Sequence, residues 1–552
     1  MPDERASIIR ELLGPDGRLI VVSNRGPVTF QVDPDAPGGI AAARGPGGLV
    51  TALGELGRHA PVTWVAAGLT EGDRLVAPML RRLPGVRAPT GRTSSPRTGA
   101  LRGRIRELLD EILPEQDLRL VYESLPDSVF HGFYGVIANP FLWFLQHQMY
   151  APAYAPNVDA GLLGAWRAGY RPANEILADA AVRAAGPATD GRRPVFLLQD
   201  YHLYLAPARI RERIPDATIL HFTHIPWPPA SVWQLLPQGL RRAICEGLLA
   251  SDIVGLQTDR YATHFLDTVA SFVRDARVDP DGRAVRWRGR RIRVRSYPIS
   301  VDPEGLLRFA HSEAVETRVD RLRERLERAG SPLVIARADR IEPSKNALRG
   351  FLAFEELLGR QPELRNRVRF VAVQAPTRTE VPEYAEYATA VREVVARING
   401  LAEPDEQPIW VYDGSDYAMA IAALRLADVV LVNPIVDGMN LVAKEAVLVG
   451  EREPVLVLSE TAGAAEQLAS DSLSVAPADI VGTADQLERG LTMPHEERRT
   501  RLRRLRASVR QEDIGWWLGR QLRDLAAIRR GETPPSRRLR DTVRRVEADV
   551  VG

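Results

Sequence analysis

The hydrophobic positions of this chain gather in short, continuous apolar runs that end in polar loops. The first run, RLIVVSNRGPV (18–28), breaks into Ser-Asn-Arg-Gly-Pro, as a buried parallel strand does where it emerges into a loop. Helical stretches such as 162–185 separate it from further runs of the same style. In the first half of the chain these runs cover residues 63–69, 194–202, 218–226 and 252–258. Alternating strands and helices predict a parallel α/β sheet.

A second series of apolar runs begins after the segment SYPISVDPE (296–304). Its strands are expected at residues 332–340, 367–376, 408–414, 428–440 and 454–460. We therefore predict two doubly wound, Rossmann-like domains, at 1–303 and 304–510. Ligands of such sheets bind outside the carboxyl ends of the strands, so the substrates are expected in a cleft between the domains. The tail 533–552 follows a proline pair and is predicted to be a weak amphipathic helix.

Composition limits the partners and the compartment. The net charge is only +2, which argues against nucleic acid or an acidic membrane surface as a partner. The Gly, Pro, Ser and Thr content of segment 85–106, with six arginines and no acid, predicts a mobile surface insertion. One cysteine, Cys245, excludes an internal disulfide and a multi-cysteine metal site. With no signal-like N-terminus and no run of about 18 apolar residues, we expect a cytoplasmic protein.

Lysine has been replaced by arginine almost everywhere in this sequence. Among 73 basic residues only Lys345 and Lys444 are lysines. Lysine offers a compact, rotatable point charge where arginine offers a wide planar fork. We expect Lys345 to need that compact charge, whereas Lys444, in the helical stretch LVAKEAV, is expected to form a salt bridge and to tolerate arginine.

The residues that follow the predicted strands are rich in cations and poor in nucleophiles. They are Arg25; Asp200, Tyr201 and His202; His224; Arg340 and Lys345; Arg378; Asp437, Gly438, Met439 and Asn440; and Glu445. Four cations at strand ends indicate a ligand with more than one phosphate group. Gly47 and Gly48, just before a predicted helix, add backbone N–H groups suited to a phosphate, and the start of the helix after Asp437 does the same.

No metal site is predicted. Asp-Pro-Asp occurs at 33–35 and at 279–281, both among glycines and prolines, where a turn is the favoured interpretation. Cations of the protein are then expected to neutralise a leaving diphosphate in place of a divalent ion, so that neither a metal nor a cofactor is needed for the chemistry.

With these residues the chain resembles the trehalose-6-phosphate synthase family of retaining glycosyltransferases, from about residue 18 to 528. The motifs occur in the order of the family: VVSNR, GGL, YGVIANPFLW, QDYHLYLAP, HIPWP, ADRIEPSKN, PTRTEVPEY, DGMNLVAKEAV and LSETAGAAEQL. The resemblance implies the GT-B fold, two Rossmann-like domains facing across a cleft, and a last helix (511–532) that crosses back to the N-terminal domain.

The resemblance also implies roles for individual residues. On the donor side, Arg340 and Lys345 would bind the diphosphate of a nucleotide-glucose and Glu445 the ribose. Asp437, with the backbone of Gly438, Met439, Asn440 and Leu441, would hold the donor glucose and its phosphate, beside Gly47 and Gly48. On the acceptor side, the residues matching the site for glucose 6-phosphate are Arg25, Tyr134, Trp143 and Arg378. Asp200 and His224 match positions beside the reacting centre, with His224 a sugar contact.

The reaction implied is transfer of glucose to glucose 6-phosphate by front-face attack with retention, which needs no protein nucleophile. Its partners are small-molecule substrates, and homo-oligomerisation is left open. The usual RLDYxKG of the family is here RIEPSKN, with Glu342, Pro343 and Asn346 at three changed positions, and Ser300 stands where glycine is frequent; both leave the nucleotide (UDP, GDP or ADP) undecided.

Four other functions are weighed against this one, and the sequence argues against the last two. Close relatives couple other acceptors: glucosylglycerol-phosphate synthases, and pseudo-glycosyltransferases that join a nucleotide-linked cyclitol to an aminocyclitol phosphate. A non-catalytic regulatory subunit would be marked by loss of Arg340, Lys345 or Glu445, and all three are present. A glycoside hydrolase needs a pair of carboxylates, and nothing pairs Asp200 with a second acid.

Overall fold

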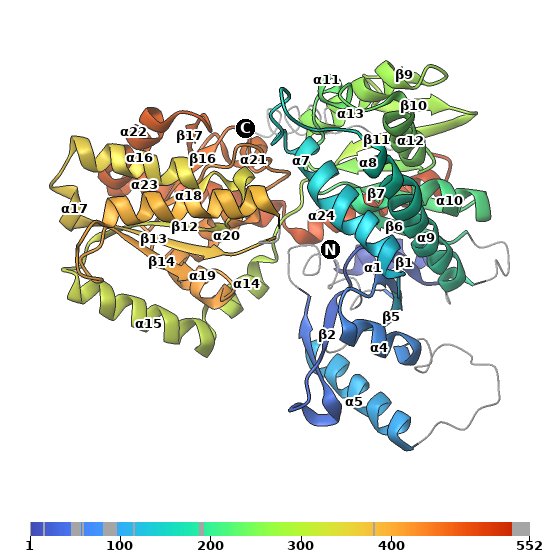
Figure 1. The fold of residues 1–552 in the computed structure, drawn as a ribbon, viewed down its shortest axis with the longest axis horizontal. Helices are drawn as coiled ribbons and strands as arrows, with labels where there is room; N and C mark the ends of the chain where they lie inside the picture. Colours follow the sequence, from blue (N-terminus) through green and yellow to red (C-terminus); the bar gives the residue numbers. More distant parts are fainter. Residues whose placement is uncertain are drawn as a thin grey trace. The chain divides into compact units, whose positions relative to one another are not determined.

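The computed structural model describes residues 2–14, 17–45, 57, 60–80, 96–113, 116–186, 193–378 and 381–532. They form two compact units (Figure 1). The first contains the chain up to Tyr297 and the segment from Leu518 onward, and the second is Pro298–Trp517. The division after Tyr297 lies a few residues before the boundary expected near 303.

The sheet of the first unit has nine described strands in the order β5-β4-β1-β6-β7-β8-β11-β10-β9. Its parallel strands are β1 (Leu19–Ser23), β4 (Val62–Ala67), β5 (Leu118–Glu123), β6 (Val195–Gln199), β7 (Thr218–Phe222), β8 (Ile253–Leu256) and β11 (Arg290–Ser296). The antiparallel strands β9 (Arg277–Asp279) and β10 (Ala284–Trp287) end it. Every residue of β1, β6 and β7 is buried, as the continuous apolar runs predict. The expected parallel α/β sheet is confirmed.

A separate antiparallel hairpin, β2 (Val28–Val32) and β3 (Ile40–Arg44), is joined through the 3₁₀ turn η1 (Pro37–Gly39). The helices of the first unit are α1 (Pro2–Leu13), α4 (Glu71–Leu80), α5 (Pro96–Ile112), α6 (Asp127–Phe130), η2 (His131–Leu142), α7 (Trp143–Gln146), α8 (Ala160–Ala165), η3 (Trp166–Tyr170), α9 (Arg171–Ala185), η4 (Tyr201–Leu203), α10 (Ala206–Arg213), α11 (Ala230–Trp233), α12 (Gln238–Leu249) and α13 (Asp259–Phe272).

The predicted mobile insertion at 85–106 is wrong for its second half. Residues 96–106 belong to helix α5, while 85–95 lie outside the described residues. The apolar positions Ile105 and Leu108 are buried, so this arginine-rich segment does have a packing face despite its polar composition.

The sheet of the second unit has six described strands, all parallel, in the order β14-β13-β12-β15-β16-β17. The strands are β12 (Leu333–Arg340), β13 (Val368–Ala375), β14 (Ile409–Asp413), β15 (Val429–Val432), β16 (Val455–Ser459) and β17 (Leu473–Val475). The helices are α14 (Pro303–Ala310), α15 (Glu313–Arg328), η5 (Pro343–Lys345), α16 (Ala347–Arg360), α17 (Leu364–Arg367), α18 (Pro382–Asn399), α19 (Tyr417–Arg425), α20 (Leu441–Val449), α21 (Ala465–Leu468), α22 (Ile480–Thr492) and α23 (His495–Gln511). In the core, Phe351 and Phe354 of α16 pack edge-on against Phe370 of β13. The second predicted parallel sheet is confirmed.

The last described helix, α24 (Ile514–Arg529), begins in the second unit and belongs to the first from Leu518 onward. Its Asp524 is buried and accepts a hydrogen bond of 2.7 Å from the hydroxyl of Tyr297, the last residue of the first unit before the division. Arg529 and Arg530 bond α1, at the Leu12 carbonyl and the Glu11 carboxylate. The tail 533–552 lies outside the described residues. None of the described helices is long and apolar enough to cross a membrane.

Candidate active site

In the first unit, strand β1 delivers Arg25 from a loop that its own polar residues hold. The Ser23 hydroxyl donates to the Arg25 carbonyl (2.6 Å) and accepts from the indole nitrogen of Trp64 (2.7 Å). The guanidinium of Arg25 is exposed, and its Nη2 donates to the hydroxyl of Tyr134 at 3.0 Å. A cation at the carboxyl end of a parallel strand thus lies beside a phenol, an arrangement suited to a phosphate.

Tyr134 and Trp143 are presented by the π-helix η2 and the residue that follows it. Because a π-helix bonds residue i to i+5, the spacing of nine is about two of its turns, and both side chains are therefore expected on one face. The Tyr134 ring stacks on Phe130, with centroids 5.3 Å apart, and lies nearly parallel to the ring of His202 at 6.1 Å. Trp143 is buried and stacks on His147.

Asp200 follows strand β6 with a backbone conformation that residues other than glycine rarely adopt (φ 73°, ψ 172°). Its Oδ1 accepts from the backbone N–H of His224 at 3.0 Å. Burial raises the pKa of Asp200 to about 6, although backbone N–H groups, including that of His224, act to lower it. Backbone strain and perturbed pKa values of this kind cluster at functional sites, so Asp200 stays a candidate site residue.

The imidazole of His224 is oriented by two glutamines. Its Nε2 lies 2.9 Å from the side-chain oxygen Oε1 of Gln199, and the side-chain amide of Gln257 donates to Nδ1 at 3.4 Å. Burial lowers the pKa of His224 to about 3, so the ring is neutral at physiological pH. A neutral, oriented imidazole is suited to hydrogen-bonding a sugar hydroxyl and unsuited to carrying a proton at neutral pH.

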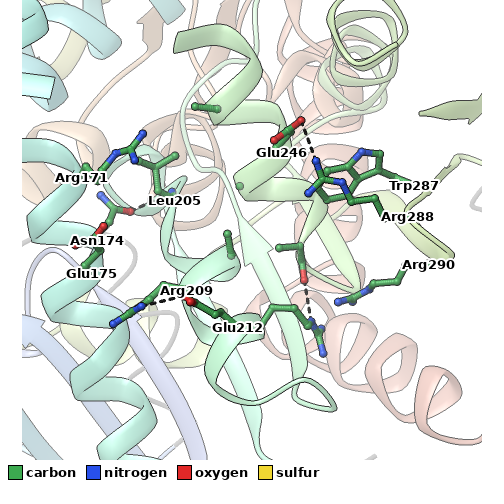
Figure 2. A pocket seen from close by; sticks show the side chains of 15 residues that line it. Arg171, Asn174, Glu175, Leu205, Arg209, Glu212, Glu246, Trp287, Arg288 and Arg290 are labelled. Carbon is green, nitrogen blue, oxygen red and sulfur yellow. Dashed lines mark hydrogen bonds and ion pairs between the residues drawn. The ribbon is translucent and has the colours of Figure 1, made fainter. Parts of the chain in front are cut away.

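A cavity of about 580 Å³ in the first unit is lined by none of the predicted site residues (Figure 2). Its arginines already face carboxylates: Arg209 pairs with Glu212 at 2.8 Å, and Arg288 lies 3.5 Å from Glu246. Asn174 in its wall bonds the carbonyl of His202 (3.0 Å) and so supports the loop that follows Asp200. The cavity thus shares Asn174 with the support of this loop, and its lining contains none of the residues predicted to bind substrate.

In the second unit, a buried arginine holds the loop that carries Lys345. Arg337 is 1% exposed, pairs with Asp339 at 2.6 Å, and donates to the carbonyls of Lys345 (3.1 Å) and Ala347 (3.4 Å). Asn346 then takes the left-handed conformation (φ 60°), which explains why asparagine can replace the usual glycine there. Arg337 was not among the residues predicted from the sequence. The sequence feature that indicates its role is a pair of opposite charges, Arg337 and Asp339, which are two positions apart and therefore lie on one face of a strand.

The predicted donor residues of the second unit come together around two carboxylates. Lys345 Nζ donates to Asp437 Oδ2 at 2.5 Å, and the Asn440 amide donates to the same oxygen at 3.1 Å. Arg340 Nη2 donates to Glu342 at 3.0 Å. The charge of Glu342 is the main cause that raises the pKa of Arg340, and that of Asp437 adds to it. The cationic heads of Arg340 and Lys345 are thus gathered in one cluster.

The backbone of residues 437–440 is shaped by the LSETAGAAEQL motif. The N–H of Gly463 donates to the Asp437 carbonyl (3.1 Å), and the N–H of Ala464 donates to the Met439 carbonyl (2.8 Å). A Cβ on Gly463 would lie 1.9 Å from the Gly438 carbonyl oxygen, so only glycine allows this approach. The loop carries Asn440 at φ 75° and leads directly into α20, which starts at Leu441.

The remaining predicted residues of the second unit are held by tyrosines. Glu445 accepts from the Tyr417 hydroxyl at 2.9 Å, and burial raises the pKa of Glu445. Arg378, at φ 46°, donates to the hydroxyl of the buried Tyr384. Arg378 belongs to the second unit, whereas Arg25 and Tyr134 belong to the first. The positive charge of Arg378 helps to lower the pKa of Glu342.

The side chain of Lys444 is completely buried, and its Nζ donates to the backbone carbonyl of Ile299 at 2.8 Å. This burial argues against the expectation that the position tolerates arginine. Helix α20 is apolar on nearly every side, and a helix of this kind is buried on all sides. The sequence LVAKEAV therefore already indicated that Lys444 is buried.

Lys444→Arg should therefore destabilise the protein by about 1–3 kcal/mol, because a larger guanidinium must be forced into a filled core. Chemical unfolding monitored by circular dichroism checks this. Arg323→Lys, at an exposed i,i+3 pair of α15, is the matched control and should leave the unfolding midpoint unchanged. An equal midpoint for both variants would contradict the packing argument.

Gly47 and Gly48 lie outside the described residues. Both Asp-Pro-Asp segments lead into turns, at 34–35 and 280–283. Among the described residues, no group of three or more His, Cys, Asp or Glu side chains is arranged to hold a metal ion.

Comparison with known proteins agrees with this geometry. The profile of glycosyltransferase family 20 matches residues 17–527. A bifunctional trehalose-6-phosphate synthase/phosphatase of Thermoproteus tenax is 36% identical over 91% of the chain, which spans only 62% of that relative. Validamine 7-phosphate valienyltransferase of Streptomyces hygroscopicus is 30% identical over 94% of this chain and 97% of its own.

Among solved structures, a UDP-forming α,α-trehalose-phosphate synthase from Burkholderia xenovorans, in complex with glucose 6-phosphate, aligns with a TM-score of 0.72 at 27% identity. The alignment covers 92% of this chain and all of the other, and the fold is the GT-B fold. The resemblance noted from the motifs is confirmed: the chain belongs to glycosyltransferase family 20.

Proposed function

We propose that this protein transfers glucose, with retention of configuration, from a nucleotide-glucose to glucose 6-phosphate and so forms α,α-trehalose 6-phosphate. The observation that carries the proposal is the cationic cluster of Arg340 and Lys345 held against Asp437 and Glu342, which suits a sugar linked to a diphosphate. The Burkholderia xenovorans enzyme, described as UDP-forming and bound to glucose 6-phosphate, supports both substrates.

In this proposal the second unit binds the donor. Arg340 and Lys345 meet the diphosphate, and Asp437 with the backbone of Gly438, Met439, Asn440 and Leu441 holds the glucose. Glu445 binds the ribose. The backbone path is preset by Gly463, so these N–H groups require little reorganisation when charge develops on the leaving phosphate. Gly47 and Gly48 remain predicted donor contacts.

The first unit supplies most of the acceptor site. Arg25, joined to Tyr134, takes the phosphate of glucose 6-phosphate, with Trp143 nearby on the same helix face and Arg378 as a further predicted contact. Asp200 and His224 bind sugar hydroxyls near the reacting carbon. The bond from the anomeric carbon to the diphosphate oxygen breaks, the acceptor hydroxyl oxygen bonds to that carbon from the same side, and its proton passes to the departing phosphate.

The test supplies purified protein with UDP-, GDP- or ADP-glucose and glucose 6-phosphate, and identifies the product by NMR. Trehalose 6-phosphate in which both anomeric carbons of the single glycosidic linkage are α is expected with at least one donor. No sugar product from any of the three donors would overturn the proposal.

A second candidate is valienyl transfer, because the Streptomyces hygroscopicus relative aligns over nearly its full length. In that reaction a nucleotide-linked cyclitol is coupled to an aminocyclitol phosphate. A parallel incubation with validamine 7-phosphate as the acceptor separates the two functions. A higher kcat/KM with validamine 7-phosphate than with glucose 6-phosphate would favour the second candidate.

Activity should survive an excess of EDTA, because Arg340 and Lys345 are expected to neutralise the negative charge of the leaving group. In many phosphoryl sites a divalent ion has this role. The initial rate with and without chelator is compared, with a known Mg²⁺-dependent kinase assayed in the same buffer as the control. Loss of turnover that added Mg²⁺ or Mn²⁺ restores would contradict this prediction.

We further propose that the protein acts in the cytoplasm. Cys245 is buried, and burial raises its pKa to about 12, which makes it an unreactive core thiol. Its substrates are small molecules, and homo-oligomerisation remains open.

A further inference from the structure

Beneath the cations of the donor site lies a buried carboxylate, Glu342, where the family usually has aspartate. The side chain is 1% exposed. Its Oε1 accepts from Arg340 Nη2 at 3.0 Å and from the hydroxyl of Ser344 at 3.1 Å. Its Oε2 is buried and has no hydrogen-bond partner within the part of the chain that the structure describes.

Glu342 stays ionised in spite of its burial. Burial pushes its pKa upward, but the positive charges of Arg340, Lys345 and Arg378 outweigh this and hold the pKa at about 2. Three cations with one anion among them repel one another less than three cations alone. The free-energy cost of burying the Glu342 carboxylate is thus partly offset by its attraction to the three cations.

The two arginines and the lysine differ in how else they are held. Lys345 has a second carboxylate, Asp437, and Arg378 has the hydroxyl of Tyr384. The side chain of Arg340 is 54% exposed and forms an ion pair with Glu342 at 3.0 Å, its one carboxylate partner among the residues that the structure describes. Arg340 therefore depends most on Glu342 for its orientation.

We propose that Glu342 is a positioning residue of the donor site, which orients Arg340 toward the leaving diphosphate and balances the charge of the cation cluster without touching the substrate. The proposal rests on the proposed function, since it assumes that a nucleoside diphosphate is the leaving group. It assigns a role to a residue that distinguishes this sequence from the common RLDYxKG form.

The decisive variant is Glu342→Gln, which keeps the shape of the side chain and removes its charge. The site then becomes more positive, so the affinity for UDP measured by calorimetry should be unchanged or higher. Arg340 loses its orienting partner, so kcat should fall about tenfold, because stabilisation of the transition state depends on donors fixed in advance. A merely structural role would weaken both UDP binding and turnover, and would lower the melting temperature.

Two further variants complete the test. Glu342→Asp keeps the charge with a side chain one methylene shorter, and its kcat should fall about two- to threefold, less than in E342Q, while UDP affinity is unchanged. Glu451→Gln is the matched control: it breaks an arginine–glutamate pair of the same unit, at Arg425, away from the cluster. Its kcat should equal that of the wild type.

Equal kcat values for wild type and E342Q, or an equal loss in E342D and E342Q, would overturn the proposal, as would a large loss of UDP affinity in E342Q. Should E342Q not fold, E342D decides alone: a reduced kcat with unchanged UDP affinity supports the role, and an unchanged kcat overturns it. If the wild type binds UDP but makes no product from glucose 6-phosphate, the proposed function fails. The comparison is then made on hydrolysis of UDP-glucose by water, which needs the cluster but no sugar acceptor.

Discussion

Lys345→Arg should lower kcat by about 10²-fold or more while leaving the affinity for the donor nucleotide largely intact, the scale expected for loss of one preorganised donor. Lys345 Nζ is held 2.5 Å from Asp437 and its backbone is fixed by Arg337, so the room at this position is set for a small head group. A planar guanidinium would be displaced from the oxygen on which charge builds as the bond to glucose breaks.

Steady-state kinetics and calorimetric titration with UDP check this prediction. The melting temperature of the variant should match that of the wild type, because the side chain of Lys345 is not in the core. This contrasts with Lys444→Arg, whose effect is on stability. If Lys345→Arg turned over as fast as the wild type, the compact charge would be dispensable and the argument from the two retained lysines would be wrong.

Arg25→Ala should weaken use of glucose 6-phosphate by about ten- to a hundredfold, because a charge-assisted hydrogen bond to a phosphate contributes roughly 1.5–3 kcal/mol. KM for glucose 6-phosphate should rise, and UDP binding should not change. Tyr134→Phe, which removes only the hydroxyl that accepts from Arg25, should have a smaller effect in the same direction.

Arg378→Ala tests the division of the cations between the two substrates. The family resemblance assigns Arg378 to the acceptor phosphate, whereas the structure shows its charge acting on Glu342, beside Arg340. A raised KM for glucose 6-phosphate supports the first assignment. Weakened UDP binding with unchanged acceptor use would place Arg378 with the donor instead, and the same outcome for Arg25→Ala would mean that the two ends of the site are reversed.

The strands that could be predicted from the sequence are those buried on both faces. Strands β1, β6 and β7 are continuous apolar runs, and such runs occur where helices cover both sides of a parallel sheet. Strands β9 to β11, at one end of the first sheet, were missed, because arginine at alternate positions of β11 makes the segment look like a polar loop. Yet Ile292 and Val294 of β11 are buried between arginines, so a period of two was present.

The site could be predicted as far as its residues follow strand ends or match family motifs. The supporting residues could not, because their roles depend on contacts between distant segments. Gly463 is needed for its approach to the carbonyl of Gly438, and Tyr384 for its bond to Arg378. Nothing local marks such partners, whereas the charge pair of Arg337 and Asp339 within one strand was open to prediction.

The path of helix α24 bears on how this protein is made. Asp524, which accepts from Tyr297, and the buried Leu522 and Leu525 belong to the first unit but are translated after the whole of the second. During synthesis from the N-terminus, an emerging first unit lacks this piece of its core until Pro298–Trp517 has left the ribosome. The N-terminal part of the first unit therefore stays incomplete until the second unit has been synthesised. A fragment ending at Tyr297 would expose an apolar surface prone to aggregation.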